Sequence, residues 1–278
     1  MPGKHIRRSD RVALSLPLEV TGSDRSGQSF LEQTHTLIIS RHGASVVLSH
    51  RLAPGDEVLL YRSDTKKKAL AHVVGQIGGR GGGYVYGLAL NNPEDWKFWG
   101  IWFPPLEKSE DAVVRVLLEC DQCARREVVY LDELEAEVFD ANRSLGRRCG
   151  DCSTSTLWTQ TRERPTASRE GRAAVGGHRP RNERKQLRIR VKMAACIRQP
   201  GFDEETVVVE DVSRGGLSFH SCKQYLEGSR IEVALPFTPG VANVFVPARI
   251  LHSRPIPGEN VNRYGVAYIK AHKGWSEE

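Results

Sequence analysis

The sequence predicts a mainly β fold, in which two small barrels of six strands each flank an α+β module that carries four cysteines. Three observations predict this fold. Short β runs separated by turn signals fill residues 11–90, and the segment from about residue 183 repeats their spacing. Two Cys-x-x-Cys pairs lie between the two copies, on either side of a helical stretch.

The composition is that of a soluble globular protein, and 278 residues suffice for two or three domains. No apolar run approaches the length that spans a bilayer, and residues 1–8 lack the apolar segment of a signal peptide. We therefore expect a cytoplasmic protein without membrane insertion. The net charge of +6 fits an anionic partner, but much of the excess lies in one arginine-rich segment, so charge alone decides little.

The first barrel is expected over residues 1–105. Its predicted strands are separated by turn signals such as Pro54-Gly55-Asp56 and a glycine cluster at 78–83, which lacks the Gly-Lys-Ser/Thr ending of a phosphate loop. The six strands are predicted over residues 11–20, 36–39, 45–48, 57–61, 69–74 and 84–90. Strands of this number and length are typical of a small barrel.

A short aromatic helix is expected at the end of this copy. Asn92 is a typical N-cap, and Pro93 is a typical first helical residue. Trp96, Trp99 and Phe103 recur at helical spacing. We expect them to cover one open end of the barrel rather than to stack on bases.

The middle module is expected over residues 106–158. Cys120, Cys123, Cys149 and Cys152 form two Cys-x-x-Cys pairs, and a tight turn at each pair points two thiolates to one side. Two such turns complete a tetrahedral four-thiolate site without an open position. This arrangement predicts a structural Zn²⁺ rather than a catalytic one, with redox chemistry as the alternative.

One helix is predicted within the module. Residues 131–140 place Leu131, Leu134 and Val138 on one helical stripe, which we expect to pack against the strands. A module this small needs its metal to fold. Its sequence lacks a dense basic face interleaved with aromatics, so a structural role is favoured over nucleic-acid reading.

Residues 159–182 are rich in Arg, Glu, Ser, Thr, Gly and Pro and contain almost no apolar side chains. This composition predicts a disordered linker. Its arginines can add weak affinity for RNA, DNA or acidic surfaces. The second barrel is expected to follow over residues 183–278.

The second barrel repeats the first in spacing as well as in residue type. Ser40-Arg-His-Gly43 corresponds to Ser213-Arg-Gly-Gly216, and the next turn glycine follows twelve positions later in both copies. The closing strands also match, with Tyr-Gly-Leu-Ala in one copy and Tyr-Gly-Val-Ala in the other. We infer that the two barrels share one ancestry.

Two short motifs in the second copy predict an anion site. Arg184 and Arg188 lie four apart before a strand, where their guanidinium groups can contact phosphate oxygens or stack on a base. Asp211 can accept the paired N–H donors of a guanine edge. Ser213 can donate to phosphate, and Gly216 lets the backbone approach a flat ligand. The two motifs together suit a guanine nucleotide.

These residues resemble the signature of the PilZ domain, the bacterial receptor module for cyclic di-GMP, which reads Arg-x-x-x-Arg and then Asp/Asn-x-Ser-x-x-Gly. The residues that match every position are Arg184, Arg188, Asp211, Ser213 and Gly216. The resemblance covers roughly residues 182–271. It implies a six-stranded antiparallel β-barrel whose arginine segment closes over cyclic di-GMP.

The first copy departs from this signature at one position. Arg7, Arg11, Ser40 and Gly43 are present, but Ile38 stands where Asp or Asn is expected. An aliphatic side chain cannot replace hydrogen bonds to a buried guanine edge, and their loss costs about 1–3 kcal/mol per unpaired group. We therefore expect weak or no ligand binding there, and a docking or dimerisation role for this barrel.

The sequence thus favours a receptor that is not an enzyme. Binding of cyclic di-GMP by the second barrel would change the conformation or the binding of a protein partner in a bacterial signalling, motility or secretion pathway. The alternatives are a zinc-ribbon protein that binds nucleic acid and a structural adaptor, with the barrels as scaffolds. No Ser/His/Asp arrangement or carboxylate pair points to catalysis.

Overall fold

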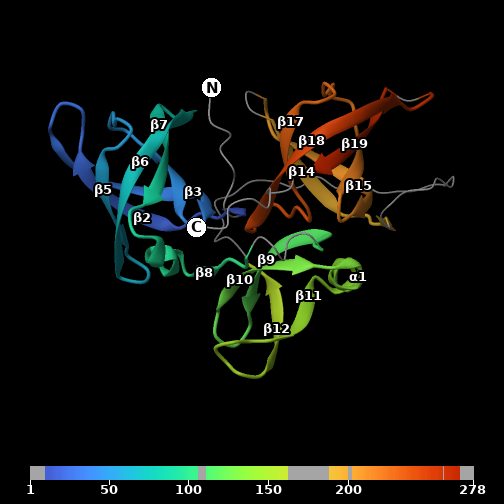
Figure 1. The fold of residues 1–278 in the computed structure, drawn as a ribbon, viewed down its shortest axis with the longest axis horizontal. Helices are drawn as coiled ribbons and strands as arrows, with labels where there is room; N and C mark the ends of the chain where they lie inside the picture. The colour runs from blue at the N-terminus through green and yellow to red at the C-terminus, as the bar shows by residue number, and fades with distance from the viewer. Residues whose placement is uncertain (1–9, 106–110, 162–187, 200–201, 259, 270–278) are drawn as a thin grey trace, which may run out of the picture.

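A computed structural model describes residues 10–105, 111–161, 188–199, 202–258 and 260–269. Figure 1 shows three bodies: an N-terminal barrel in blue to teal, a C-terminal barrel in orange to red, and a smaller green to yellow unit beside both. Among these described residues the fold is mainly β, with 58% strand and 7% helix. The predicted fold class is therefore confirmed.

Among the described residues, the N-terminal barrel is built from six antiparallel strands. They are β2 (Pro17–Ser23), β3 (Ser29–Ser40), β4 (Gly43–Leu48), β5 (Glu57–Arg62), β6 (Lys67–Arg80) and β7 (Gly83–Leu90). The strand order is β3-β2-β5-β6-β7-β4, and pairing of β3 with β4 closes the barrel. The glycine cluster turns the β6–β7 hairpin, as the sequence predicts.

The predicted strand over residues 11–20 is divided in two, β1 (Arg11–Ala13) and β2. The side chain of Thr36, in β3, separates them. Its hydroxyl donates to the carbonyl of Leu14 at 2.6 Å and accepts the N–H of Leu16 at 2.9 Å. Because one buried hydroxyl takes over these backbone bonds, the chain leaves the ladder between β1 and β2.

The C-terminal barrel has the same construction within the described residues. Its strands are β13 (Ile189–Arg190), β14 (Ala194–Arg198), β15 (Glu205–Ser213), β16 (Gly216–Ser221), β17 (Arg230–Ala234), β18 (Asn243–Pro255) and β19 (Asn262–Tyr268). The order β14-β15-β16-β19-β18-β17 closes where β17 pairs with β14. Strand for strand, this is the order of the first barrel.

A buried tyrosine in the last strand of each barrel repeats the same contacts. The Tyr86 hydroxyl accepts the N–H of Leu52 at 2.9 Å, and the Tyr264 hydroxyl accepts the N–H of Tyr225 at 3.2 Å. Each hydroxyl also donates to a carbonyl two residues earlier in that same loop. The internal repeat therefore extends to side-chain geometry.

The aromatic helix after the first barrel is a 3₁₀ helix, η1 (Pro93–Trp99). The Asn92 side chain accepts the N–H of Glu94, as an N-cap does. Trp99 and Phe103 are buried in the same cluster as the barrel interior, so both pack against the barrel core. The side chain of Trp96 lies outside the described residues.

The smaller unit is a five-stranded sheet with one α-helix among the described residues. Its elements are β8 (Ile101–Trp102), β9 (Val114–Cys120), β10 (Arg126–Leu131), α1 (Glu133–Asn142), β11 (Ser144–Arg148) and β12 (Ser155–Gln160), and the strand order is β11-β12-β9-β10-β8. The sheet thus begins before residue 106 and ends after residue 158. The predicted linker at 159–182 lies outside the described residues from position 162 onward.

The predicted apolar stripe of helix α1 is wrong. Leu134 is 71% exposed and Val138 is 41% exposed, whereas Ala136 and Phe139 are buried. Leu131 ends β10, and Asp132 starts the helix through a capping box with Glu135. Leu131 therefore lies outside the helix, which begins two residues later than predicted, and the face that packs on the core is that of Ala136 and Phe139.

Strand β9 joins the three bodies, since both of its faces are buried. Val116 and Leu118 belong to a core cluster shared with the C-terminal barrel. Leu117, on the opposite face, belongs to the core of the N-terminal barrel. Alternation along one strand thus places the small unit between the two barrels.

The barrels also contact each other directly. Strand β1 pairs with β3 of its own barrel on one side and with β18 of the C-terminal barrel on the other. Val12 faces Val244 in that second ladder, and both side chains lie in the N-terminal core cluster. None of the helices among the described residues is long and apolar enough to cross a membrane.

Candidate functional site

The turn between β15 and β16 holds the Asp-x-Ser-x-x-Gly motif. The Ser213 hydroxyl donates to the carbonyl of Gly216 at 3.2 Å and so braces the turn. A Cβ on Gly216 would lie 1.8 Å from the carbonyl oxygen of Val266 in β19. The barrel itself therefore requires glycine here, which differs from the predicted reason that a ligand must approach.

The same turn recurs in the first barrel with the same contacts. Ser40 donates to the carbonyl of Gly43 at 3.1 Å. A Cβ on Gly43 would lie 2.0 Å from the carbonyl oxygen of Leu88. Serine and glycine thus serve the turn in both copies, and their presence alone does not indicate a ligand.

Asp211 is the centre of a charged cluster on the C-terminal barrel. Asp211 is 9% exposed, and its carboxylate accepts from Arg188 at 2.5 Å and from Arg263 at 3.1 Å. Arg263 also lies 2.8 Å from Glu210, and His220 lies 3.4 Å from the same carboxylate. The structure therefore brings Arg188, Asp211, Ser213 and Gly216 onto one side of the barrel, while Arg184 lies outside the described residues.

Arg263 belongs to this charged cluster, although the sequence motifs do not predict it. It lies 52 positions after Asp211 and meets it only because β16 lies between β15 and β19. The internal repeat shows that the two copies differ at this position, because Val85 occupies the corresponding position of the first barrel. His220 pairs with Arg263 as Val47 pairs with Val85.

The strand registers confirm how the two copies correspond. Asp211 pairs with Ser218 after a bulge in β15, and Ile38 pairs with Ser45 after a bulge at the same place in β3. The correspondence reaches the neighbouring charged positions. Glu210, Asp211, His220 and Arg263 of the second barrel are replaced by Leu37, Ile38, Val47 and Val85 in the first.

The arginine strand of the first barrel contacts the second barrel instead. Arg11 occupies the place of Arg188 by register, and its guanidinium lies 3.7 Å from Glu232 in β17. Arg7 lies outside the described residues. In this copy the strand that carries the arginine therefore contributes to an interface between barrels.

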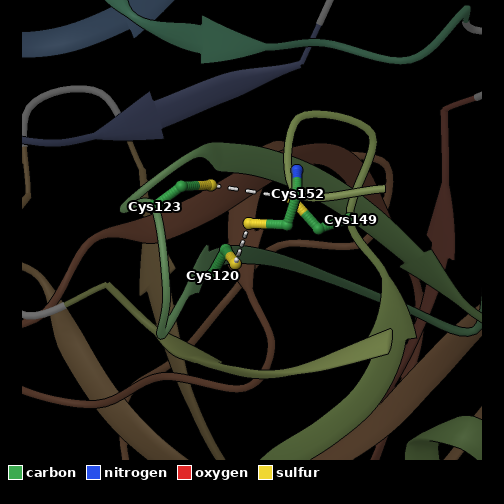
Figure 2. A group of neighbouring side chains, drawn as sticks. All are labelled: Cys120, Cys123, Cys149 and Cys152. Carbon is green, nitrogen blue, oxygen red and sulfur yellow. Dashed lines mark hydrogen bonds between the residues drawn. The ribbon is translucent and has the colours of Figure 1, made fainter. Parts of the chain in front are cut away.

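The four cysteines of the small unit converge, as Figure 2 shows. All four sulfur atoms lie within 4.8 Å of one another, and none forms a disulfide. Sγ of Cys123 is 3.6 Å from that of Cys149, and Sγ of Cys120 is 3.9 Å from that of Cys152. Zn–S bonds of about 2.3 Å give a tetrahedron with edges of roughly 3.8 Å, so these residues fit a four-thiolate zinc site.

The two cysteine turns share one backbone geometry. The N–H of Ala124 bonds the carbonyl of Cys120, and the N–H of Ser153 bonds the carbonyl of Cys149. Both Ala124 and Ser153 have positive φ, 56° and 57°, which is uncommon for residues other than glycine. Two matched turns of this kind present the thiols to a common centre.

The environment of Cys120 favours a thiolate. Burial raises the pKa of this thiol, but the hydrogen bond with Thr156 and the backbone N–H groups of Gln122 and Cys123 lower it, so that the pKa falls to about 6. The hydrogen bond with Cys123 and burial raise the pKa of Cys152. A cluster that stabilises one thiolate at neutral pH is suited to bind a soft divalent metal ion.

The motif turn of the C-terminal barrel is bound to the small unit through Arg214. Its guanidinium donates two hydrogen bonds to Glu133, at 3.0 and 3.2 Å, and one to Asp111 at 2.8 Å. Glu133 is the first residue of α1. Arg214 lies between Ser213 and Gly216, so the motif turn and the cysteine unit share a direct charged contact.

A second contact between the three bodies centres on Arg115, in β9. Its guanidinium lies 3.7 Å from Asp10, which precedes β1, and 5.6 Å from the ring centroids of Tyr130 and Tyr268. The N–H of Tyr268 bonds the carbonyl of Gly215 in the motif turn. One buried arginine thus links the motif turn, the small unit and the start of the first barrel.

Comparison with known proteins finds the PilZ domain family at residues 5–95 and 181–273. None of the curated proteins matches the chain. The similar solved structures include the Bacillus subtilis inhibitor of motility MotI/DgrA, at 10% identity and a TM-score of 0.28, over 96% of this chain and 90% of that chain.

Two further structures contain c-di-GMP. MrkH of K. pneumonia in complex with c-di-GMP matches at 8% identity and a TM-score of 0.28, over 95% of this chain and 80% of that chain. Escherichia coli YcgR in complex with c-di-GMP matches at 11% identity and a TM-score of 0.25, over 91% and 76%. TM-scores this low carry no argument about the whole chain. The two family matches cover more than half of the sequence, and this chain therefore belongs to the PilZ family, with a PilZ domain in each of its two barrels.

Proposed function

We propose that the protein is a bacterial cyclic di-GMP receptor in which only the C-terminal barrel binds the ligand. The proposed site residues are Arg184, Arg188, Asp211, Ser213 and Gly216. The observation that carries this proposal is that Asp211, on the outer face of the barrel sheet, is bonded by two arginines that cover it. The protein then acts as an effector rather than an enzyme, inside the cytoplasm.

The ligand would take over the bonds that Asp211 makes to arginine. A guanine edge presents two parallel N–H donors, which a carboxylate accepts as it accepts a guanidinium. Arg188 is then released to contact phosphate or to stack on a base, together with Arg184. Ordering the arginine segment offsets part of this gain.

The corresponding surface of the N-terminal barrel lacks these groups. Ile38 accepts no hydrogen bond, and the neighbouring Leu37, Val47 and Val85 replace a carboxylate, an imidazole and a guanidinium. We propose that Arg7, Arg11, Ile38, Ser40 and Gly43 form no binding site. The first barrel instead serves as a scaffold. Its strand β1 attaches it to the second barrel.

We propose that Cys120, Cys123, Cys149 and Cys152 hold a structural Zn²⁺. The metal would join the two cysteine turns, so that β9 and β12 keep their positions under both barrels. The proposed division of the chain is a barrel at 1–105, the cysteine module at 106–158, a linker at 159–182 and the second barrel at 183–278. Strand β8 and the end of β12 complete the module's sheet from outside those bounds.

Arg214 and Tyr268 connect the proposed binding site to the cysteine module. Arg214 belongs to the motif turn and bonds Glu133 of the cysteine module, whereas Tyr268 contacts both Gly215 of the turn and Arg115 of the module. A shift of that turn on ligand binding would move α1 relative to the barrel. We propose that this movement changes the binding of a protein partner in a signalling, motility or secretion pathway.

Calorimetric titration of the full chain with cyclic di-GMP tests the receptor proposal. Arg188→Ala and Asp211→Ala should each weaken binding by about 10-fold or more, because each removes charged hydrogen bonds. The matched variants Arg11→Ala and Ile38→Ala change the corresponding positions of the first barrel and should leave the affinity unchanged. Binding that survives both changes in the second barrel would refute the proposed site.

A further inference from the structure

The outer surface of the C-terminal barrel carries a row of residues that continues beyond the proposed site. Asp211 of β15 pairs with Ser218 of β16, Ser218 pairs with Gly265 of β19, and Gly265 pairs with His252 of β18. Residues directly opposite one another in antiparallel strands project to the same face. The row therefore crosses four strands, with Asp211 at one end and His252 at the other.

Ser218 projects outward from this sheet, because its neighbours Leu217 and Phe219 both lie in the barrel core. Its side chain is nevertheless buried, at 3% exposure, and its hydroxyl has no hydrogen-bond partner among the described residues. Buried hydroxyls in folded proteins are almost always paired. The Ser218 hydroxyl, next to the acceptor Asp211, is therefore a candidate partner for a ligand atom.

His252 lies directly over Gly265. A Cβ on Gly265 would be 2.2 Å from Cε1 and 2.5 Å from Nε2 of the imidazole. Glycine at this position thus makes room for an aromatic ring on the outer surface of the strand. His252 itself is exposed, and so are Arg249 and Arg254 on the same strand. The end of the row combines a ring for stacking with positive charge for phosphate.

The first barrel shows the same row without its two ends. The corresponding residues are Ile38, Ser45, Gly87 and Gly75. Serine and the central glycine are present in both copies, but Asp211 is replaced by Ile38 and His252 by Gly75. The barrel that carries the base-reading carboxylate is therefore also the one that carries the ring.

We propose that this row binds a second purine base, with the Ser218 hydroxyl bonded to the base edge and the His252 imidazole stacked on its face. The proposal rests on the receptor function above. The imidazole lies over Gly265, two strand spacings of about 4.8 Å from Asp211, or roughly 10 Å, so the ring stacks on a different base from the one bonded to Asp211. The second base comes from the same cyclic dinucleotide or from a second molecule bound beside it.

Titration of the full chain with cyclic di-GMP tests the row. His252→Ala should weaken binding about 5-fold or more, because one base loses its stacking partner. His252→Phe retains a ring and should bind nearly as well as the wild type. The control is His72→Ala, which removes a surface histidine from β6 of the first barrel and should have no effect.

Two further measurements separate the possible outcomes. On ligand addition, the Cε1 proton of His252 should shift upfield in NMR spectra, as expected for a ring under a stacked base. One molecule bound per chain assigns the second base to the same dinucleotide, and two per chain assign it to a second molecule. If the wild type binds and His252→Ala binds equally well, the second-base proposal is wrong and the receptor proposal remains. Absence of wild-type binding would overturn both proposals.

Discussion

At the scale of single residues, the motif separates what the barrel needs from what a ligand needs. Ser40 and Ser213 brace the same turn, and Gly43 and Gly216 avoid the same collision with a neighbouring carbonyl. The barrel fold does not require an aspartate at position 211, since Ile38 occupies the corresponding position of the other barrel. Of the motif residues with a counterpart in both described copies, the aspartate therefore best distinguishes a binding barrel from a scaffold.

This distinction predicts that Gly43→Ala and Gly216→Ala destabilise their barrels alike. The added Cβ would lie about 2 Å from a backbone carbonyl in either case, and such overpacking costs at least about 2 kcal/mol. Chemical denaturation of the two variants measures the loss. A Gly43→Ala protein as stable as the wild type would show that only the ligand requires this glycine.

The motif residues could be identified from the sequence because they lie close together along the chain. Arg263 and Arg214 could not, since their partners are set by strand pairing and by contact between domains. Arg263 reaches Asp211 across β16, and Arg214 reaches Glu133 from 81 residues away. Local spacing contains no information about such pairs.

At the scale of elements, the cysteine module is the part of the fold that depends most on contacts between residues distant in the sequence. Its four cysteines were evident from spacing as a candidate metal site, and the structure brings their sulfur atoms together. Its helix face was not evident, because the start of α1 depends on where β10 ends. Its strand β9 is buried on both faces by two different barrels, so alternation of polar and apolar residues is missing there.

Metal removal is predicted to destabilise the whole chain, since the module's core is continuous with both barrels. Cys123→Ser, at an exposed ligand position, should lower the Tm by at least about 4 °C and abolish stoichiometric zinc in metal analysis. The control Cys222→Ser changes an exposed cysteine outside the cluster. An unchanged Tm after complete chelation would contradict a structural metal.

Because of the contact between α1 and the motif turn, we predict that the stability of the folded protein decreases at acidic pH. The hydrogen bond from Arg214 lowers the pKa of Glu133 below its ordinary value of 4.5. A lowered carboxyl pKa contributes stability above the unfolded pKa, and that contribution disappears as the pH falls through the folded pKa. Between pH 5 and about 3, the wild type should therefore lose slightly more stability than Glu133→Gln, by less than about 1 kcal/mol.

Thermal unfolding of both proteins across this range measures the difference. Arg214→Ala should remove it as effectively as Glu133→Gln, because either change breaks the same bond. Parallel pH profiles for all three proteins would mean that the contact contributes nothing in solution.

At the scale of the whole molecule, two barrels with the same strand order carry different residues at corresponding positions. The repeat was visible in the sequence, and the matching strand orders and registers confirm it. The joining of the barrels was not visible, because β1 is three residues long and pairs with a strand more than two hundred positions away. In one copy the arginine strand lies beside the charged cluster, and in the other it fastens the barrels together.

Hydrogen exchange of the full chain, measured with and without cyclic di-GMP, tests most directly whether only the C-terminal barrel binds. The ligand should slow exchange in β15 and β16, over residues 205–221, and alter it in α1, over residues 133–142. It should leave residues 29–48, the corresponding strands of the first barrel, unchanged. Slower exchange at 29–48, or none at 205–221, would contradict a receptor whose two barrels divide binding and scaffolding between them.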